Sequence, residues 1–275
     1  MAWTDTAATY YWKGTDADGD FRNTTGNNWV NSTGTVAGAG KYPSLAYADT
    51  IILPDFGAYA ITTNLNNSAA AGSIVAFTRQ QGFAYGFGTV QNPLYLKLSG
   101  SPVFRFEDDS EGDMYLITGT TAISALHVLK TGSSDDALHL VTSHAVTTAN
   151  ITAGNVVLDS SLFGVASTGI ATLNLSKQSG GSQPTVTSHA PVTTALNNYG
   201  GKFYWNEVTI GALNNYDGTF SCEKSTIART LTASTCYGGT VDFRTGKPGT
   251  ITLTAPIAYK GGAIYWDLGE SLQRS

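Results

Sequence analysis

Apolar residues recur at every second position, or in short continuous runs, along most of this chain. Alternation is clear in Ile251-Thr252-Leu253-Thr254, and compact apolar runs occupy 74–77, 94–98 and 103–106. Gly, Asn, Pro and acidic residues separate these runs, and no stretch sustains the 3.6-residue apolar period of a helix. The pattern predicts an all-β chain, nearly free of helix, whose alternate strand residues point inward.

The segment 142–266 repeats itself. Ala195–Phe203 (ALNNYGGKF) returns as Ala212–Phe220 (ALNNYDGTF), and its Tyr and Gly positions recur in two further units. The repeated residues are Tyr199, Gly201, Tyr216, Gly218, Tyr237, Gly239, Tyr259 and Gly262. The tyrosines are 17, 21 and 22 residues apart (216−199, 237−216 and 259−237). A period near 20 with strand patterning predicts a solenoid whose coils stack on one another.

A longer echo joins Thr142–Ala149 (TSHAVTTA) to Thr187–Ala195, which has one inserted Pro191. It places His144 and His189 at equivalent positions of coils two apart. Equivalent side chains in a solenoid usually serve the same structural corner. A metal site would need a third converging ligand, and nothing in the sequence brings His127 or His139 to them.

The first 60 residues differ from the rest. They contain three of the five tryptophans, Trp3, Trp12 and Trp29. Because an open end of stacked coils must be covered, we expect residues 1–60 to form an aromatic-rich cap over a solenoid body at 61–275. An arm that reaches a partner is the alternative. The three tryptophans and Arg274 are the candidate contacts.

Composition narrows the partners. Charged residues make up 13% of the chain, and Gly numbers 31. The formal net charge of −5 argues against a general nucleic-acid binder, which would need a basic surface. No apolar run approaches the ~20 residues needed to cross a bilayer, and no leader pattern is visible after Met1, so we expect synthesis in the cytoplasm. Cys222 and Cys236 are too few for a disulfide framework, and we expect buried free thiols.

Two acidic segments are candidate sites. Asp16-Ala17-Asp18-Gly19-Asp20 has the oxygen-rich alternation that calcium favours, but Asn27 stands where an EF-hand needs Glu, so an acidic turn is the preferred interpretation. Glu107–Asp113 gathers five acids, and Asp135-Asp136 follows on another loop. Carboxylates on neighbouring coils can cleave polysaccharides, but acids crowded on one turn favour a solvated loop or a subunit contact. No nucleophile elbow, phosphate loop or zinc motif appears, and we expect no enzyme activity, cofactor or metal.

The unit Leu-Asn-Asn-Tyr-Gly-Gly-x-Phe, at 196–203, resembles the coils of short right-handed parallel β-helices in bacteriophage virion proteins. The opening Trp12-x-Gly14, Asn28-Trp29, Pro43 and Asp49-Thr50-Ile51-Ile52 is similar to the start of such modules in phage proteins and autotransporters. The resemblance covers about half the chain. It implies a single-stranded right-handed β-solenoid and a viral structural protein.

Three functional hypotheses follow. The first is a capsid decoration, or cement, protein in the virion that binds the major capsid protein without nucleic acid or membrane; the resemblance implies a homotrimer. The second is a tailspike that binds or cleaves surface polysaccharide, with Asp108, Asp109, Asp135 or Asp159 as its essential acids. The third is a surface adhesin fragment.

Overall fold

The computed structural model describes most of the chain. The described residues are 8–15, 18–24, 26–43, 45–54, 57, 61, 65, 73–80, 87–106, 113–118, 122–130, 137–162, 164–179, 183–206, 209–222, 228–244, 250–265 and 273–274. They form 23 strands and contain no helix. The prediction of an all-β chain is therefore confirmed.

Most strands belong to two ladders, which alternate along the chain. In the first ladder each strand from β1 to β17 pairs in parallel with the next member, and β20 pairs in parallel with β23. Its members are β1 (Thr9–Trp12), β3 (Ala48–Leu53), β4 (Ser73–Arg79), β6 (Leu98–Phe106), β8 (Ile123–Lys130), β10 (Val146–Ile151), β14 (Ile170–Leu175), the first halves of β16 (Val192–Trp205) and β17 (Ile210–Cys222), β18 (Arg229–Cys236), β20 (Ile251–Leu253), β21 (Ile257–Tyr259) and β23 (Gln273–Arg274). The exception to simple succession is at the end, where β18 pairs with both β20 and β21.

The second ladder consists of the intervening strands, again paired in parallel. Its members are β5 (Leu94–Leu96), β7 (Met114–Thr118), β9 (Ala137–Thr142), β11 (Asn155–Leu158), β15 (Thr185–Ser188), the second halves of β16 and β17, β19 (Thr240–Asp242) and β22 (Ala263–Tyr265). Antiparallel pairing is confined to β1 with β2 (Trp29–Val30) and to the hairpin of β12 (Ser161–Leu162) and β13 (Val165–Ala166), apart from one isolated bridge, among the described residues.

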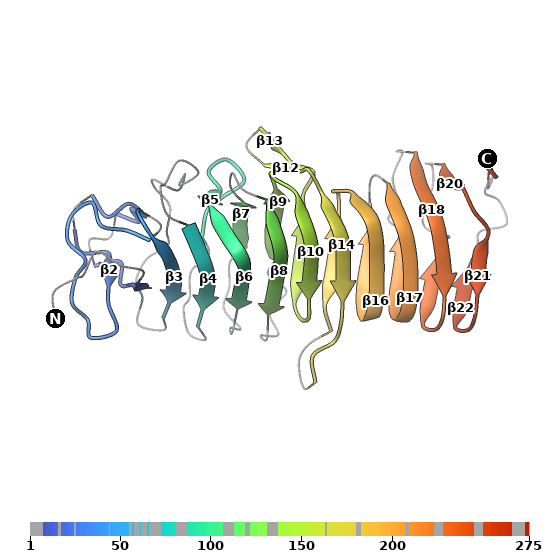
Figure 1. Ribbon diagram of the computed structural model, residues 1–275, viewed down its shortest axis with the longest axis horizontal. Helices are drawn as coiled ribbons and strands as arrows, with labels where there is room; N and C mark the ends of the chain where they lie inside the picture. Colours follow the sequence, from blue (N-terminus) through green and yellow to red (C-terminus); the bar gives the residue numbers. More distant parts are fainter. Residues whose placement is uncertain are drawn as a thin grey trace.

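The two ladders join because β16 and β17 run through the corner between them without a break, giving a single 21-stranded sheet. Pairing therefore connects strands that are two elements apart in sequence, as in a stack of coils. Figure 1 shows the strands side by side along the long axis, with the two chain ends at opposite ends of the molecule. The architecture is solenoid-like, as the sequence repeat predicts.

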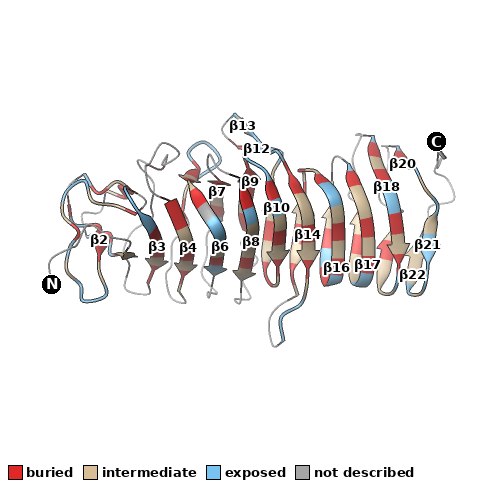
Figure 2. Cartoon of the chain, viewed as in Figure 1, coloured by how far each residue is buried: buried red, intermediate tan, exposed pale blue. Residues whose placement is uncertain are grey.

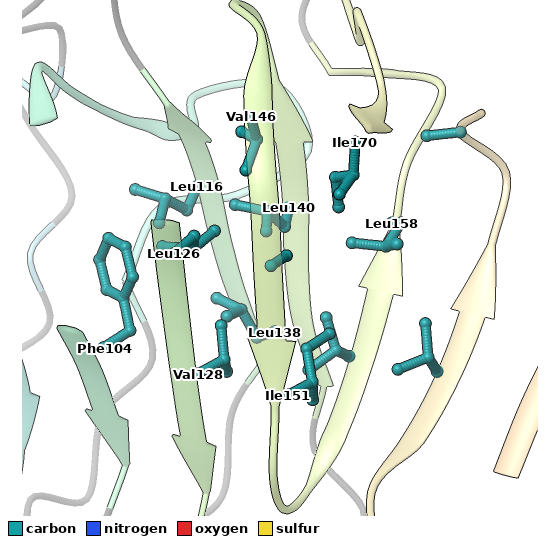
Figure 3. Packing of buried hydrophobic residues seen from close by; sticks show 14 of the residues in the cluster. Phe104, Leu116, Leu126, Val128, Leu138, Leu140, Val146, Ile151, Leu158 and Ile170 are labelled. Atoms are coloured by element: carbon teal, nitrogen blue, oxygen red, sulfur yellow. The ribbon is translucent and has the colours of Figure 1, made fainter. Parts of the chain in front are cut away.

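The core is a continuous column of apolar side chains along the stack. In β10, Val146, Ala149 and Ile151 are buried, whereas the outward Thr148 and Asn150 are partly exposed. Figure 2 shows this banding of buried and exposed positions along successive strands. Side chains of both ladders, such as Leu126 and Leu140, point toward each other in Figure 3. Alternate-residue patterning thus produces one shared interior.

The short repeat is confirmed as stacked coils, with one correction. Ala195, Asn197 and Phe203 pair with Ala212, Asn214 and Phe220 in the same order as in the sequence repeat. Tyr259, however, pairs with Cys236. The backbone N–H of Lys260 bonds to the Cys236 carbonyl as that of Tyr237 bonds to the Asn215 carbonyl. Lys260 therefore occupies the tyrosine position of the last coil, and the prediction that placed Tyr259 there is wrong.

The longer echo does not mark equivalent positions. Thr187 pairs with Val157, and Val157 pairs with His139, so His189 lies in the row that also contains Asp159. His144 instead precedes Val146, the row of Ile170 and Val192. Coils of unequal length separate two segments that are alike in sequence.

The aromatic N-terminal segment is part of the stack. β1 pairs with β3 and β3 with β4, so the core continues across the expected boundary at residue 60. Trp12 and Trp29 are 0% exposed and lie edge to face, 4.9 Å apart. The Trp29 indole donates to the carbonyl of Phe21 at 2.7 Å. These two tryptophans hold the cap together and are not available as contacts, while Trp3 lies outside the described residues.

Candidate functional site

The carboxylates of the acidic turn near the N-terminus accept hydrogen bonds from backbone N–H groups of the same turn. The Asp20 carboxylate accepts N–H groups of Arg22 and Thr24, at 3.0 and 2.9 Å. Asp18 accepts the backbone N–H of Asp20 and the side-chain amide of Asn28. Asp16 lies outside the described residues. The two described carboxylates thus fix the turn, but Asp20 is buried, so the expectation of a solvated acidic turn is wrong at that residue.

The second acidic segment contributes one described residue, Asp113, because 107–112 and 135–136 lie outside the described residues. Asp113 precedes β7, and its Oδ1 accepts the N–H of Ala137 at the start of β9 at 2.9 Å. Its Oδ2 accepts the Tyr115 hydroxyl at 3.4 Å. Asp113 therefore connects two successive coils of the second ladder.

A histidine lies between Asp113 and a second carboxylate. Tyr115 and His139 are paired residues of β7 and β9, and their rings stack at 4.5 Å with 15° between planes. Nδ1 of His139 is 3.0 Å from Oδ2 of Asp159, and Nε2 is 3.9 Å from Oδ2 of Asp113. We call Asp113, Tyr115, His139 and Asp159 the His139 cluster. Three coils supply its members, so stacking brings together residues distant in sequence.

The hairpin β12–β13 adds an apolar patch on the outer side of the same ladder. Leu162 of the hairpin is buried against Ile117 and Val141, with Tyr115 and Val165 at the margin. Because Ile117 and Val141 follow the cluster along β7 and β9, the patch borders it. The hairpin is therefore a local addition to the otherwise regular coils.

The His139 cluster is partly open to solvent. The side chains of His139, Asp113 and Asp159 are 21%, 44% and 20% exposed. Partial burial, together with the nearby Asp113 carboxylate, raises the pKa of Tyr115 above its ordinary value. A carboxylate on one imidazole nitrogen orients the ring and leaves the other nitrogen to exchange a proton. His139 and Asp159 are 20 residues apart in the sequence, and only the register shows that they meet.

The repeated glycines form a column at the corner between the ladders. Gly218, Gly239 and Gly262 have φ of +81°, +63° and +82°. A Cβ on Gly218 would lie 2.2 Å from the Gly201 carbonyl oxygen, and one on Gly239 would lie 2.3 Å from that of Gly218. The coils therefore approach too closely here for any side chain, which explains Gly218, Gly239 and Gly262; at Gly201 a Cβ would lie 3.0 Å from the Leu175 Cβ, which is tight but not excluded.

Asparagine side chains cap that corner from inside. The Asn198 Oδ1 accepts the N–H groups of Gly200 and Gly201, and its amide donates to Oδ1 of Asn215 at 2.8 Å. Asn215 in turn donates to the Gly238 carbonyl at 2.7 Å. Cys236 holds the next position of this column. Both Cys222 and Cys236 are buried free thiols, as predicted.

The predicted tyrosines do assemble, except the last. Tyr199, Tyr216 and Tyr237 stack face to face at 4.7 and 4.6 Å with 9° and 7° between planes. Desolvation, with the two neighbouring tyrosines, raises the pKa of Tyr216. All three remain 39–48% exposed.

An outward asparagine ladder, missed in the sequence, runs beside the tyrosine stack. Asn214 donates to Asn197, Asn197 to Asn174, and Asn174 to Asn150, each at 2.9 Å. The recurring Asn one residue after a buried apolar position was the available signal.

Other predictions find little support as sites. The backbone of Arg274 pairs with Leu253 in β23, and its side chain lies outside the described residues. Within the described ranges, no three His, Cys, Asp or Glu side chains are arranged to hold a metal ion. No helix in the described part of the chain is long and apolar enough to cross a membrane.

No protein-family model matches the chain, and no curated protein or solved structure matches it either.

Proposed function

We propose that the chain is a non-enzymatic structural protein of a bacteriophage virion, a decoration protein that binds between major capsid protein subunits as a homotrimer. The observation that carries this proposal is the parallel pairing that continues coil by coil from β3 to β20 and β21. Backbone pairing of this kind gives a stiff body whose useful property is its shape and contact area. The viral setting and the trimer come from the sequence resemblance.

The finer fold is part of the same proposal: a single-stranded, right-handed parallel β-helix. Crossovers between parallel strands of one sheet are right-handed in almost all proteins because of strand twist. The parallel pairing between strands two elements apart supports this handedness without measuring it.

A decoration protein stabilises a shell because it binds the assembled state and not the separate subunits. At a free concentration of 100 times Kd, each occupied site adds about 2.7 kcal/mol to the assembled state. Side-chain ladders that keep the coils rigid reduce the ordering cost of such binding.

The test is co-sedimentation of the purified chain with empty shells built from the major capsid protein encoded in the same genome. Saturable binding and a higher disruption temperature of the shell are the expected results. A chain that ignores shells and degrades a capsular polysaccharide would refute the proposal.

The His139 cluster favours a second candidate, binding or cleavage of a surface polysaccharide. General acid–base chemistry by a positioned side chain contributes about 10²–10⁴-fold to a rate. If the chain cleaves a glycan, His139→Gln and Asp159→Asn should each lower the rate at least about 100-fold. His144→Gln is the matched control, because His144 is exposed and its described partner is Ser143. Equal activity of all three variants would remove the cluster from consideration.

A further inference from the structure

Three outward columns of side chains cover the first ladder where the coils are tightest. Strand alternation turns every second residue of β16, β17 and β18 outward. The register places the alanines above one another and Asn197 above Asn214. The tyrosines are aligned by ring stacking, because Tyr199 pairs with Asp217 across a register shift. The columns are Ala195, Ala212 and Ala233; Asn197, Asn214 and Thr235; and Tyr199, Tyr216 and Tyr237. We call this surface the ladder face. The Ala and Asn columns continue through Thr172 and Asn174 of β14 to Thr148 and Asn150 of β10.

The ladder face is ordered before anything binds it. Each tyrosine ring is held by its stacked neighbours, and each asparagine amide by the next one in the ladder. Immobilising a long side chain at an interface ordinarily costs binding free energy, and here that cost is already met in the free chain. Tyrosine and asparagine are also residue types that form protein contacts well when they are rigid.

Charge distinguishes this face from the opposite ladder. Apart from the tyrosines, its three columns over β10 to β18 contain no ionisable side chain, and the nearest charged group is the exposed Asp217, the register partner of Tyr199; His127 and Lys260 continue the asparagine and tyrosine columns beyond these strands. Outward positions of the second ladder include His139, Lys202 and Asp242. Because the chain carries a net charge of −5, two copies repel each other least where they meet on an uncharged surface.

The repeat distance identifies the partner. Successive tyrosine rings are 4.6–4.7 Å apart, and their faces cover one another, so they present edges and hydroxyl groups outward. A sugar cannot stack on a ring face that is already covered. A partner that meets every rung needs the same spacing, and another copy of this chain has it. We propose that the ladder face joins copies of this chain side by side.

The available area supports a modest interface. Two columns over five strands and the tyrosine column over three, at ~4.8 Å by ~7 Å per position, give a face of about 440 Å² per copy, or about 900 Å² in total. That is close to the lower limit for a specific interface, so we expect association in roughly the micromolar range. This inference rests on the self-association within the proposed function but not on shell binding; in a homotrimer the ladder face of each copy meets a different side of the next copy.

The test introduces a charge without touching either side-chain ladder. Ala233 is exposed and belongs to neither the asparagine ladder nor the tyrosine stack. Sedimentation from about 0.1 to 100 µM should show self-association of the wild type, and Ala233→Lys should raise Kd at least about 100-fold. Ser221→Lys, on the opposite ladder in the adjoining coil, should leave Kd unchanged. Circular dichroism checks that each variant is folded.

A second measurement uses the wild type alone, so it tests the interface even if Ala233→Lys does not fold. Acylation of tyrosine hydroxyls in the wild type should label Tyr216 at low concentration and spare it at high concentration. Tyr47, which is equally exposed but lies near β3, should be labelled throughout. A wild type that stays monomeric at 100 µM overturns the inference, as does an Ala233→Lys chain that associates normally. If the chain is monomeric and Ala233→Lys weakens shell binding, the face binds the shell; shell binding within the proposed function then survives, while its homotrimer and this inference fail.

Discussion

The close approach of coils at the glycine corner can be measured by one substitution, Gly218→Ala. Gly218 has φ of +81°, and an added Cβ would lie 2.2 Å from the carbonyl oxygen of Gly201 and 2.9 Å from its amide nitrogen. Both contacts are backbone atoms, so the neighbouring coil must move. Gly100 is the matched control: its φ is +65°, and a Cβ there would meet nothing within 4 Å.

The two variants share one cost and differ in the other. A left-handed backbone costs an L-residue about 1–2 kcal/mol, and this applies at both positions. Forcing packed backbone apart adds about 1–3 kcal/mol at Gly218 alone. We therefore expect a loss of about 1–2 kcal/mol for Gly100→Ala and about 2–5 kcal/mol for Gly218→Ala.

Urea unfolding followed by circular dichroism measures both losses in the same buffer. At roughly 2–4 °C per kcal/mol, the thermal midpoint of Gly218→Ala should fall about twice as far as that of Gly100→Ala. Equal losses would mean that the backbone conformation, and not the approach of the coils, selects glycine at this corner. That result would refute the reasoning about coil spacing.

Three further predictions concern single side chains. Asn198→Ala should cost about 3 kcal/mol in urea unfolding, because two backbone N–H groups lose their acceptor in the interior, whereas Asn197→Ala in the outward ladder should cost about 1 kcal/mol. Hydrogen bonding from Arg244 lowers the pKa of Asp242. The ionised Asp242 therefore contributes its full share of the folding free energy above the ordinary carboxyl pKa, and this share is lost as pH falls through the lowered pKa. In melting curves recorded at several pH values, Arg244→Gln should lose less thermal stability on acidification than the wild type. Burial raises the pKa of Cys236, so its thiol should resist iodoacetamide in the native chain and react after unfolding, which mass spectrometry would detect.

The repeat at 195–220 could be predicted because its residues recur at a constant distance, and the structure stacks them in the same order. The last unit shows where such reasoning stops. Gly262 does lie over Gly239, since a Cβ there would meet the Gly239 carbonyl at 2.5 Å, but Tyr259 is one residue out of step. Close backbone approach admits glycine alone, whereas an exposed stacking position also accepts Lys260. The glycine contact is therefore kept in the last coil, whereas the exposed tyrosine position is taken by another residue type.

Residues from unequal coils could not be brought together from the sequence. His139 meets Asp113 and Asp159 only through the register of β7, β9 and β11, and the loops between these strands differ in length. The tryptophans gave a related ambiguity, because an aromatic cap and an aromatic arm have the same composition. Pairing of β1 with β3 buries Trp12 and places this part of the segment in the stack, whereas Trp3 lies outside the described residues.

The two surface features lie in different kinds of coil, and this separates their possible roles. The ladder face is complete over β16 to β18. There β16 and β17 pass through the corner without a loop, and the close backbone contacts allow little change in coil length or in the corner residues. The His139 cluster lies at β7 to β11, beside the inserted hairpin β12–β13, where coils vary in length. Binding that depends on regular spacing belongs to the first region, and chemistry that needs unlike groups in contact belongs to the second. Ala233→Lys and His139→Gln change one region each, so a function lost in only one variant can be assigned to its coils.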